Sequence, residues 1–525
     1  MIQSAAPKSS HSKSPTKILI TGRDVTIDQV WAVAYSDAQV ELASDARSKM
    51  AASRAYIEKK MTGGEAIYGV NTGFGAFSSV RISDDEIDQL QRNLIRSHCV
   101  GIGAPFTLEE TRAIMFLRAN CLANGLSGIR ALVVDKILEF LNAGVIPVIP
   151  QQGSVGASGD LAPLSHLALA IIGEGEAWKD GQAVDVALIL KEKGLTPLDL
   201  KAKEGLSMIN GCQVMTAVGL LNAYEARRLV WMVDVAGAMT LEAMQGTRDA
   251  FDPLIAAARP HYGEAQTARN LMKILSPTSS IAESHADCGR VQDAYSLRCM
   301  PAVHGAAKNS LKRAIETLEI EANSATDNPL VFSDDGKILS CGNFHGEPVA
   351  FVLDFMAIAI SAMASMSECR IEKLINPAMS GLPAFLAPAG GLNSGHMIVQ
   401  VAAAALVSEN KILSHPASVD SIPTSADKED HVSMGTIAAR KFGAIVRNAE
   451  NIVAMEFLSA TQALDLLAPL KAAGAVQPVH DLIRSKVPFA KVDRVFAKDI
   501  EEIKKLIRAD AITGAVHASV GPLEA

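Results

Sequence analysis

The pattern of apolar and polar positions changes near residue 214. Before it, in residues 18–213, short apolar runs alternate with Gly-rich stretches and amphipathic pieces. Thr107-Leu108-Glu109-Glu110 has the sequence of a capping box and predicts a helix that starts there. That helix carries Ile114, Leu117 and Cys121 at helical spacing on one face. We therefore expect an N-terminal domain of mixed texture at 18–213.

From residue 214 onward, long runs of helix-forming residues are apolar on most sides, which is typical of helices inside a bundle. These runs are Val214–Met244, Leu311–Glu321, Val349–Leu374 and His396–Leu413. Near the C-terminus, residues 495–507 keep an amphipathic spacing and predict a surface helix. The expected fold class is mainly α: the mixed N-terminal domain is followed by a long central helical bundle at 214–525.

Composition excludes several classes of function. Of the 525 residues, 49% are hydrophobic and only 5% aromatic, which favours closely packed helices. The net charge of −8 gives no electrostatic footprint for nucleic acid or for an anionic membrane. The longest apolar run, Ala350–Met366, is interrupted by Asp354 and is short for a span, so we interpret it as a buried helix.

The cysteines and the first residues indicate a compartment. The seven cysteines are spread out without a CxxC pair, which excludes a disulfide scaffold and a zinc ribbon and favours the reducing cytoplasm. Residues 1–17 are rich in Ser, Lys and Pro and lack an apolar core, so we expect a disordered tail. A transit peptide is the alternative, although this tail contains no Arg.

The segment from Gly153 to His166, GSVGASGDLAPLSH, carries the most chemical information. Its Gly spacing does not match the G-x-S-x-G elbow of serine hydrolases, and it lacks the GKS or GKT of a phosphate loop. A plain loop that caps the helix starting near Asp160 is the simplest alternative. The Ala157-Ser158-Gly159 sequence has a further capacity: in a tight bend, the Gly159 nitrogen can attack the Ala157 carbonyl, since Gly has no Cβ in the way. Loss of water and of the Ser158 hydroxyl then leaves a methylidene-imidazolone (MIO) ring, a strong electrophile.

This segment resembles the signature of the aromatic amino-acid ammonia-lyase family continuously from Gly153 to His166. The resemblance runs from about Thr26 to about Leu506 and implies the all-α architecture shared by ammonia-lyases and fumarases. It also implies that MIO, formed from Ala157, Ser158 and Gly159, is the only cofactor, with no metal or nucleotide. The family pools site residues from several subunits, so we expect a homotetramer.

The resemblance also assigns site residues. Tyr68, in Y-G-x-N-T-G-F-G, is the catalytic base, and Asn210 hydrogen-bonds the MIO oxygen. In the Q-D-x-Y-S-x-R motif, Arg298 clamps the substrate carboxylate, while Gln292 and the catalytic Tyr295 line the same pocket. Phe344 flanks the pocket. Plain alternatives remain at this stage: a core Tyr at 68, an Asn-Gly turn at 210, a surface ion pair at 298 and a core Phe at 344.

Two positions address which amino acid is the substrate. Ser97-His98 occupies the place of the dipeptide that reads the substrate side chain, and His98 can hydrogen-bond an imidazole or a phenol. Glu429 stands where phenylalanine- and tyrosine-cleaving members usually have Gln, and its carboxylate suits a basic imidazole. We therefore expect Glu429 to be catalytic and the substrate to be L-histidine.

Three observations qualify this picture. Asp427-Lys428 replaces the usual Asn-Gln of histidine-cleaving members, and His396 replaces a usual Phe. Glu429-Asp430-His431 is an alternative metal cluster, which we set aside because three adjacent residues cannot all face one ion on a helix.

The expected reaction is the non-oxidative elimination of ammonia from L-histidine to give trans-urocanate. A tyrosine or phenylalanine ammonia-lyase, or an aminomutase on the same scaffold, is the first alternative. The second is a non-catalytic helical scaffold, against which the intact Ala157-Ser158-Gly159, Tyr68 and Arg298 argue. The expected partners are a small amino acid and further copies of the chain, with no nucleic acid and no membrane.

Overall fold

The computed structural model describes residues 17–524, except 37, 63–66, 74–76, 78–79 and 84. The expected tail lies outside the described residues apart from Lys17, which begins strand β1 (Lys17–Ile20). Phe74 and Gly75 of the Tyr68 motif also lie outside them.

The chain forms two compact units, each built from three segments. Unit 1 comprises Met1–Tyr224, Ala314–Asp354 and Pro416–Arg440, and unit 2 comprises Glu225–Arg313, Phe355–His415 and Lys441–Ala525. These units differ from the contiguous domains expected at 18–213 and 214–525, because two later segments fold back into unit 1.

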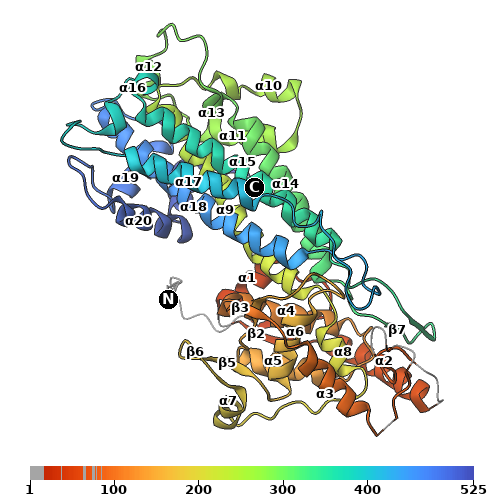
Figure 1. The fold of residues 1–525 in the computed structure, drawn as a ribbon. Helices are drawn as coiled ribbons and strands as arrows, with labels where there is room; N and C mark the ends of the chain where they lie inside the picture. Colours follow the sequence, from red (N-terminus) through yellow and green to blue (C-terminus); the bar gives the residue numbers. More distant parts are fainter. Residues whose placement is uncertain are drawn as a thin grey trace. The chain divides into compact units, whose positions relative to one another are not determined.

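Unit 1 combines short helices with small two-stranded sheets (Figure 1). Its helices are α1 Ile27–Tyr35, α2 Ser44–Thr62, α3 Ile87–His98, α4 Leu108–Ala123, α5 Ala131–Asn142, α6 Leu161–Ile171, α7 Val186–Lys193 and α8 Glu204–Ile209. After β1, its strands are β2 Gln39–Leu42, β3 Ile102–Pro105, β4 Pro150–Gln152, β5 Glu176–Lys179, β6 Gln182–Asp185, β7 Leu330–Phe332 and β8 Lys337–Leu339. The β1–β2 pair is parallel, and the pairs β3–β4, β5–β6 and β7–β8 are antiparallel.

The capping box predicted from the sequence is confirmed at the start of α4. The Thr107 hydroxyl accepts from the Glu110 amide at 3.1 Å, and the Glu110 carboxylate accepts from the Thr107 amide at 2.9 Å. Ile114, Leu117 and Cys121 are buried as expected. Most other positions of α4 are buried too, so the helix lies inside unit 1 rather than on its surface.

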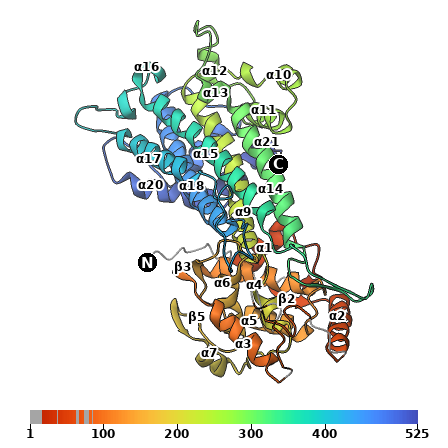
Figure 2. The ribbon, with the colours of Figure 1, turned by 45° about the vertical axis from the view of Figure 1, so that its right-hand side comes forward.

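Four long helices carry the chain between the units: α9 Gln213–Ala243, α14 Met300–Ala322, α15 Glu347–Ile375 and α18 Gly435–Leu466. They run alongside one another in both Figure 1 and Figure 2. The predicted runs starting at 214, 349 and 396 are confirmed as α9, α15 and α17 (Met397–Leu413), and the run from 311 is the second half of α14. Helix α18 was not predicted. The mainly α fold class is confirmed.

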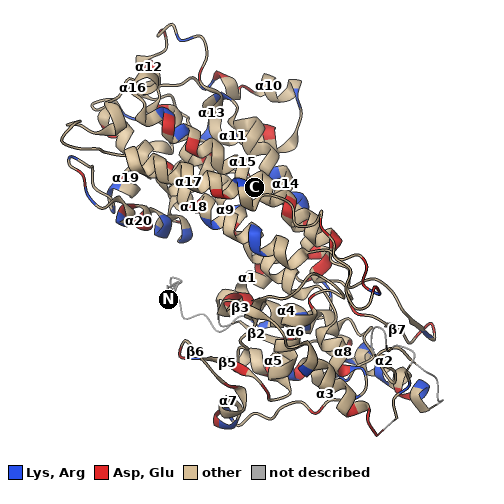
Figure 3. Ribbon diagram, in the orientation of Figure 1, with Lys and Arg blue, Asp and Glu red and all other residues tan. Residues whose placement is uncertain are grey.

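Smaller helices complete unit 2. They are α10 Pro253–Ala258, α11 Tyr262–Ile274, α12 Ser280–Ser284, α13 Tyr295–Arg298, α16 Pro377–Ser380, α19 Val476–Arg484, α20 Phe496–Arg508 and α21 Ala511–Val520, with 3-10 turns at Asp249–Phe251 and Ala384–Leu386. On α20, Ile503, Leu506 and Ile507 are buried, as the amphipathic pattern predicted, and most of the charged residues are exposed (Figure 3). The charged Asp499 and Lys504 are buried as well, whereas Val495, just before the helix, is exposed.

A buried polar network ties the long helices together within unit 2. On α14, His304 Nδ1 lies 2.8 Å from Asp234 of α9, and the Lys308 ammonium also contacts Asp234. Arg370 of α15 pairs with Glu456 of α18 at 2.7 Å and donates to His304 Nε2 at 3.2 Å. Burial lowers the pKa of His304, which agrees with a neutral ring that donates from Nδ1 and accepts at Nε2. Each buried charge therefore has a partner.

Helix α15 is the one helix of the described chain that is long and apolar enough to cross a membrane by length and composition. Of the most apolar 18-residue window of α15, 56% is buried inside the protein. This burial agrees with the buried helix that the sequence predicted.

Candidate active site

A cavity of about 820 Å³ lies in unit 1. Five of the predicted site residues line it: Tyr68, His98, Ser158, Asn210 and Glu429. Apolar side chains, among them Leu90, Leu94 and Leu206, cover much of the rest of its wall. The cavity therefore joins polar groups from the first part of the chain with the segment that precedes α18.

The Ala157-Ser158-Gly159 loop is held in an unusual backbone conformation. Ser158 has φ 50° and Gly159 φ 76°, both in the left-handed region that favours glycine. A Cβ on Gly159 would lie 2.2 Å from the Gly211 carbonyl oxygen, so only glycine fits there. The Gly211 amide donates to the Ser158 carbonyl at 3.2 Å, which pins the bend against the turn after α8. A tight bend with no Cβ at 159 is what cyclisation requires, so these residues fit the MIO group.

Buried Asp160 anchors the end of this loop. Its carboxylate accepts from the Thr436 hydroxyl at 2.5 Å and from the backbone amides of Val214 and Met215 at 2.9 and 3.0 Å. Burial raises the pKa of Asp160 to about 6, although these hydrogen bonds oppose the rise. Asp160 thus connects the loop to the starts of α9 and α18.

A late segment of the chain also packs directly on the loop. The Met434 amide donates to the Val155 carbonyl at 2.9 Å. Gly156 lies so close to Ser433 that an added Cβ would be 2.3 Å from the Ser433 hydroxyl. The loop conformation therefore depends on residues 433–436 as well as on its own sequence.

The Glu429 carboxylate accepts hydrogen bonds from three hydroxyl groups at the cavity. Its Oε1 accepts from the Ser158 hydroxyl at 3.1 Å, and its Oε2 accepts from Thr424 and Ser425 at 3.0 and 2.6 Å. Thr424 and Glu429 also pair through their backbones and close a tight turn. Glu429 is therefore fixed in direct contact with the residue that the sequence identifies as the MIO precursor.

His98, the last residue of α3, has a defined hydrogen-bonding role. Its Nδ1 lies 2.8 Å from the Leu94 carbonyl oxygen. Because a carbonyl oxygen can only accept, Nδ1 carries the proton, and Nε2 of the neutral ring is left as an acceptor. His98 thus offers the cavity a lone pair.

Tyr68 is positioned by a turn whose neighbours are core residues. Ile67 and Val70 are buried in a cluster with Ile57, Ile87 and Val331, and half-buried Tyr68 lies between them and lines the cavity. The Asn71 side chain accepts from the Ile67 amide at 2.8 Å and closes the turn.

Asn210 is tied to a buried ion pair. Its side-chain nitrogen donates to Asp327 at 3.1 Å and to the Asn328 carbonyl at 3.3 Å, which uses both amide protons. Asp327 also pairs with buried Lys203 at 2.7 Å. Burial alone would raise the pKa of Asp327, but Lys203 holds it below its usual range. The bond from Asn210 to an MIO oxygen that the sequence predicts would therefore require one of these protons to change partner.

The residues predicted to bind the substrate carboxylate lie in unit 2, around α13. Arg298 donates to Gln292 at 3.1 Å and stacks over the Tyr295 ring at 4.4 Å, so the three predicted residues are brought together. Tyr295 is 70% exposed, which leaves its ring accessible. Within one chain, the five cavity residues and these three belong to different units.

Two further predicted positions are not among the described residues that line the cavity. Phe344 is half-buried, and its carbonyl accepts from the Cys212 thiol at 2.9 Å. His396 is buried in unit 2, where its ring meets Phe496 edge-on at 5.0 Å. The His396 substitution therefore alters core packing in unit 2.

Sequence reasoning missed the groups that orient the site. Thr424 and Ser425 hold Glu429, and Lys203 with Asp327 holds Asn210. For the residues that hold Glu429, the only signal in the sequence was the polar pair Thr424-Ser425 shortly before that acid. Lys203 gave no signal, because a lysine in a charged stretch is ordinarily exposed.

The fold and the Gly-Ser loop define the class of protein. The family model of aromatic amino acid lyases matches residues 25–485, and the chain belongs to this family and is a lyase. A histidine ammonia-lyase of Koribacter versatilis is 53% identical over 511 residues, which covers 95% of this chain and 99% of that protein. The architecture is thus the ammonia-lyase fold that the sequence predicted.

Two solved structures extend the comparison. The histidine ammonia-lyase from Trypanosoma cruzi has a TM-score of 0.89 at 44% identity, with 96% of this chain and 95% of that chain covered. The tyrosine aminomutase from Streptomyces globisporus has a TM-score of 0.92 at 35% identity, with 97% and 100% covered.

Proposed function

We propose that this protein is a histidine ammonia-lyase that converts L-histidine to trans-urocanate and ammonia. The observation that carries the proposal is Glu429, a carboxylate fixed inside an otherwise largely apolar cavity and in contact with Ser158. Once cyclisation removes the Ser158 hydroxyl, an aromatic hydrocarbon ring would leave Oε1 of that carboxylate without a donor, whereas an imidazole brings an N–H to it. The 53% identity to a histidine ammonia-lyase supports the same substrate.

Ala157, Ser158 and Gly159 would form the MIO group, and the bend at φ 50° and 76° supports this assignment. When present, this group supplies an electrophile that makes the substrate amine a leaving group. Loss of the Ser158 hydroxyl on cyclisation would also remove one donor from Glu429 and free its Oε1 for the substrate.

The chain's own residues then divide the work. Tyr68 takes the β-proton, and its place on a turn anchored in the core supports a fixed position for the base. Arg298 holds the substrate carboxylate with two parallel donors, and Gln292, Tyr295 and Phe344 complete the binding surface. Glu429 accepts the N–H of the substrate imidazole, and His98 Nε2 accepts the second N–H that the ring carries when it is protonated. Asn210 donates to the cofactor oxygen.

Self-association would bring the two residue groups into one site. The clamp residues lie in unit 2 and the loop in unit 1, which supports a homotetramer whose sites combine different copies. All seven cysteines are free, which supports a cytoplasmic location.

The decisive experiment compares kcat/KM for L-histidine, L-tyrosine and L-phenylalanine and identifies each product. We expect histidine to be preferred and urocanate to be the product. Preference for tyrosine or phenylalanine would instead favour an ammonia-lyase for that amino acid or an aminomutase, and a β-amino acid as the product would identify the aminomutase. That alternative has one specific support, the TM-score of 0.92 to a tyrosine aminomutase.

A further inference from the structure

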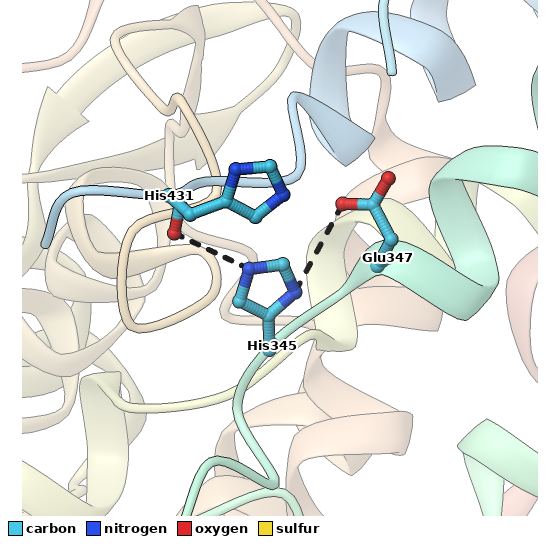
Figure 4. Close-up of side chains that lie close together, drawn as sticks. All are labelled: His345, Glu347 and His431. Atoms are coloured by element: carbon cyan, nitrogen blue, oxygen red, sulfur yellow. Dashed lines mark hydrogen bonds and ion pairs between the residues drawn. The ribbon is translucent and has the colours of Figure 1, made fainter. Parts of the chain in front are cut away.

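Three potential metal ligands from distant parts of the chain meet in unit 1. His345 follows β8, Glu347 begins α15, and His431 lies between α17 and α18. One ligand atom from each lies within 4.8 Å of the other two. Figure 4 shows the two imidazole rings stacked, with a nitrogen of each ring and the Glu347 carboxylate on the same side. The ring centroids are 5.7 Å apart and the planes differ by 7°.

The proton positions on His345 make this meeting unusual. Its Nε2 lies 3.3 Å from the His431 carbonyl oxygen, which can only accept, so Nε2 carries the hydrogen. The lone pair of the neutral ring is then on Nδ1, which faces a Glu347 oxygen at 4.0 Å. Two acceptors thus face each other at a separation that is too long for a hydrogen bond.

Glu347 adds an independent observation. Its Oε2 atom is buried and has no hydrogen-bond partner among the residues that the structure describes. A carboxylate oxygen removed from water without a donor is costly, and a cation at this point would compensate it.

We propose that His345, Glu347 and His431 bind one divalent transition-metal ion, with Zn²⁺ as the best match. Two imidazole nitrogens and one carboxylate oxygen are zinc ligands, and the fourth position would be left to water. Tetrahedral bonds of ~2.1 Å place ligand atoms about 3.4 Å apart. Because the two rings are nearly parallel, binding requires the imidazoles to rotate about their side-chain torsions until both lone pairs converge on the ion. The bond from His345 Nε2 to a carbonyl matches the usual support of a metal-bound histidine.

The proposal replaces the cluster of adjacent residues that sequence analysis set aside. Glu429 and His431 do not share an ion: His431 has partners on other elements, and Glu429 faces the cavity. The ion would hold the segment that carries Glu429 against the start of α15. That consequence rests on the proposed function, whereas metal binding itself does not.

The test is metal binding to the full-length protein after treatment with a chelator. Titration with Co²⁺ should give about one ion per chain, with the visible absorption of four-coordinate cobalt, and Zn²⁺ should displace it. His431→Ala and Glu347→Gln should each weaken Co²⁺ binding at least about tenfold. His261→Ala, which removes an exposed histidine outside the cluster, should bind as the wild type does.

The competing explanation is that Glu347 only complements the positive end of α15, where an acidic residue is favourable without any ion. It predicts that wild type, His431→Ala and Glu347→Gln bind Co²⁺ equally or not at all, and either result overturns the proposal. All variants keep the seven cysteines, so adventitious thiol binding is common to them. Because His431 is exposed, its alanine variant tests the ligand without disturbing the core. Zn²⁺ should also raise the melting temperature of the wild type and of His261→Ala, but not that of His431→Ala.

Discussion

At the scale of single residues, the chemistry of Glu429 depends on its hydroxyl neighbours. Thr424 and Ser425 occupy one oxygen, and Ser158 occupies the other. The carboxylate therefore has one oxygen held by two neighbouring hydroxyls and one whose partner is Ser158, the proposed MIO precursor. This division lets Glu429 keep its orientation while it exchanges a partner.

Glu429→Gln tests whether this oxygen selects the substrate. A hydrogen bond to a charged group contributes about 1.5–3 kcal/mol, so histidine kcat/KM should fall about ten- to a hundredfold. Activity on tyrosine or phenylalanine should fall less or rise, since the amide costs less to bury beside a ring. Kinetics with the three amino acids measures both effects. An unchanged histidine value and preference order would mean that Glu429 never meets the substrate.

His396 illustrates a residue whose departure from the family pattern affects stability instead. Burial lowers its pKa to about 3, with the positive charges of Arg484 and Arg494 acting in the same direction. In the unfolded chain the imidazole titrates near ~6.5, so between these values the unfolded state binds more protons. Stability from this group is therefore present above ~6.5 and is lost as the pH falls.

His396→Phe should remove this acid sensitivity. When the pH falls from about 7 to about 4.5, the wild type should lose on the order of 3 kcal/mol more of its unfolding free energy than the variant does. Urea unfolding at both pH values measures the change, and His261→Ala serves as the control for an exposed histidine. A parallel pH dependence of variant and wild type would show that His396 is not held neutral.

At the scale of elements, the reactive loop combines a recognisable sequence with a geometry that no short segment can impose. The order Ala157-Ser158-Gly159 predicted the chemistry, and helix-forming runs predicted α9, α15 and α17. The left-handed backbone at Ser158 was not predictable, because contacts with Gly211, Ser433 and Met434 impose it. The same holds for the turn at Ser425, Ala426 and Asp427, where three non-glycine residues in succession have positive φ.

Ser158→Ala tests the loop directly. The variant should fold normally, because alanine retains the backbone, but it should lose the near-UV absorption of MIO and nearly all turnover. Ser165→Ala, on α6 in the same signature, should keep both, since its hydroxyl only bonds the Leu161 carbonyl one turn earlier. Ultraviolet spectra and histidine turnover of the two variants provide the measurement. Full activity of Ser158→Ala would exclude the electrophile.

At the scale of the whole molecule, the sequence suggested candidate site residues but did not predict how they are distributed between the two units. Tyr68, Ser158 and Glu429 share a cavity, whereas Arg298 belongs to the other unit. Local patterns predict helices and motifs because those depend on neighbouring residues. The non-contiguous units depend on tertiary packing between segments far apart in the chain, for which a single sequence carries no local signal.

Co-expression of Ser158→Ala with Arg298→Ala tests whether sites combine different copies. Each variant alone should be nearly inactive. Mixed oligomers should recover about a quarter of wild-type activity, because random mixing gives some sites both intact residues. Purification with two affinity tags isolates the mixed species, and light scattering gives its size. If mixed tetramers stay as inactive as the parents, both residues of a site come from one chain.

Ser433, Met434 and Thr436 pack on the Ala157-Ser158-Gly159 loop but are synthesised long after it. The contacts that bend the loop can therefore form only late in synthesis. Thr436 contacts Asp160 across 276 residues of sequence. When Ser158 leaves the ribosome, the segment that bends its backbone has not yet been made. A fragment that ends before Ser433 should therefore carry an ordinary serine, however long it is incubated. On the proposed MIO chemistry, self-processing would occur only after the late segment has docked, so incomplete chains would carry no reactive electrophile while they are being made.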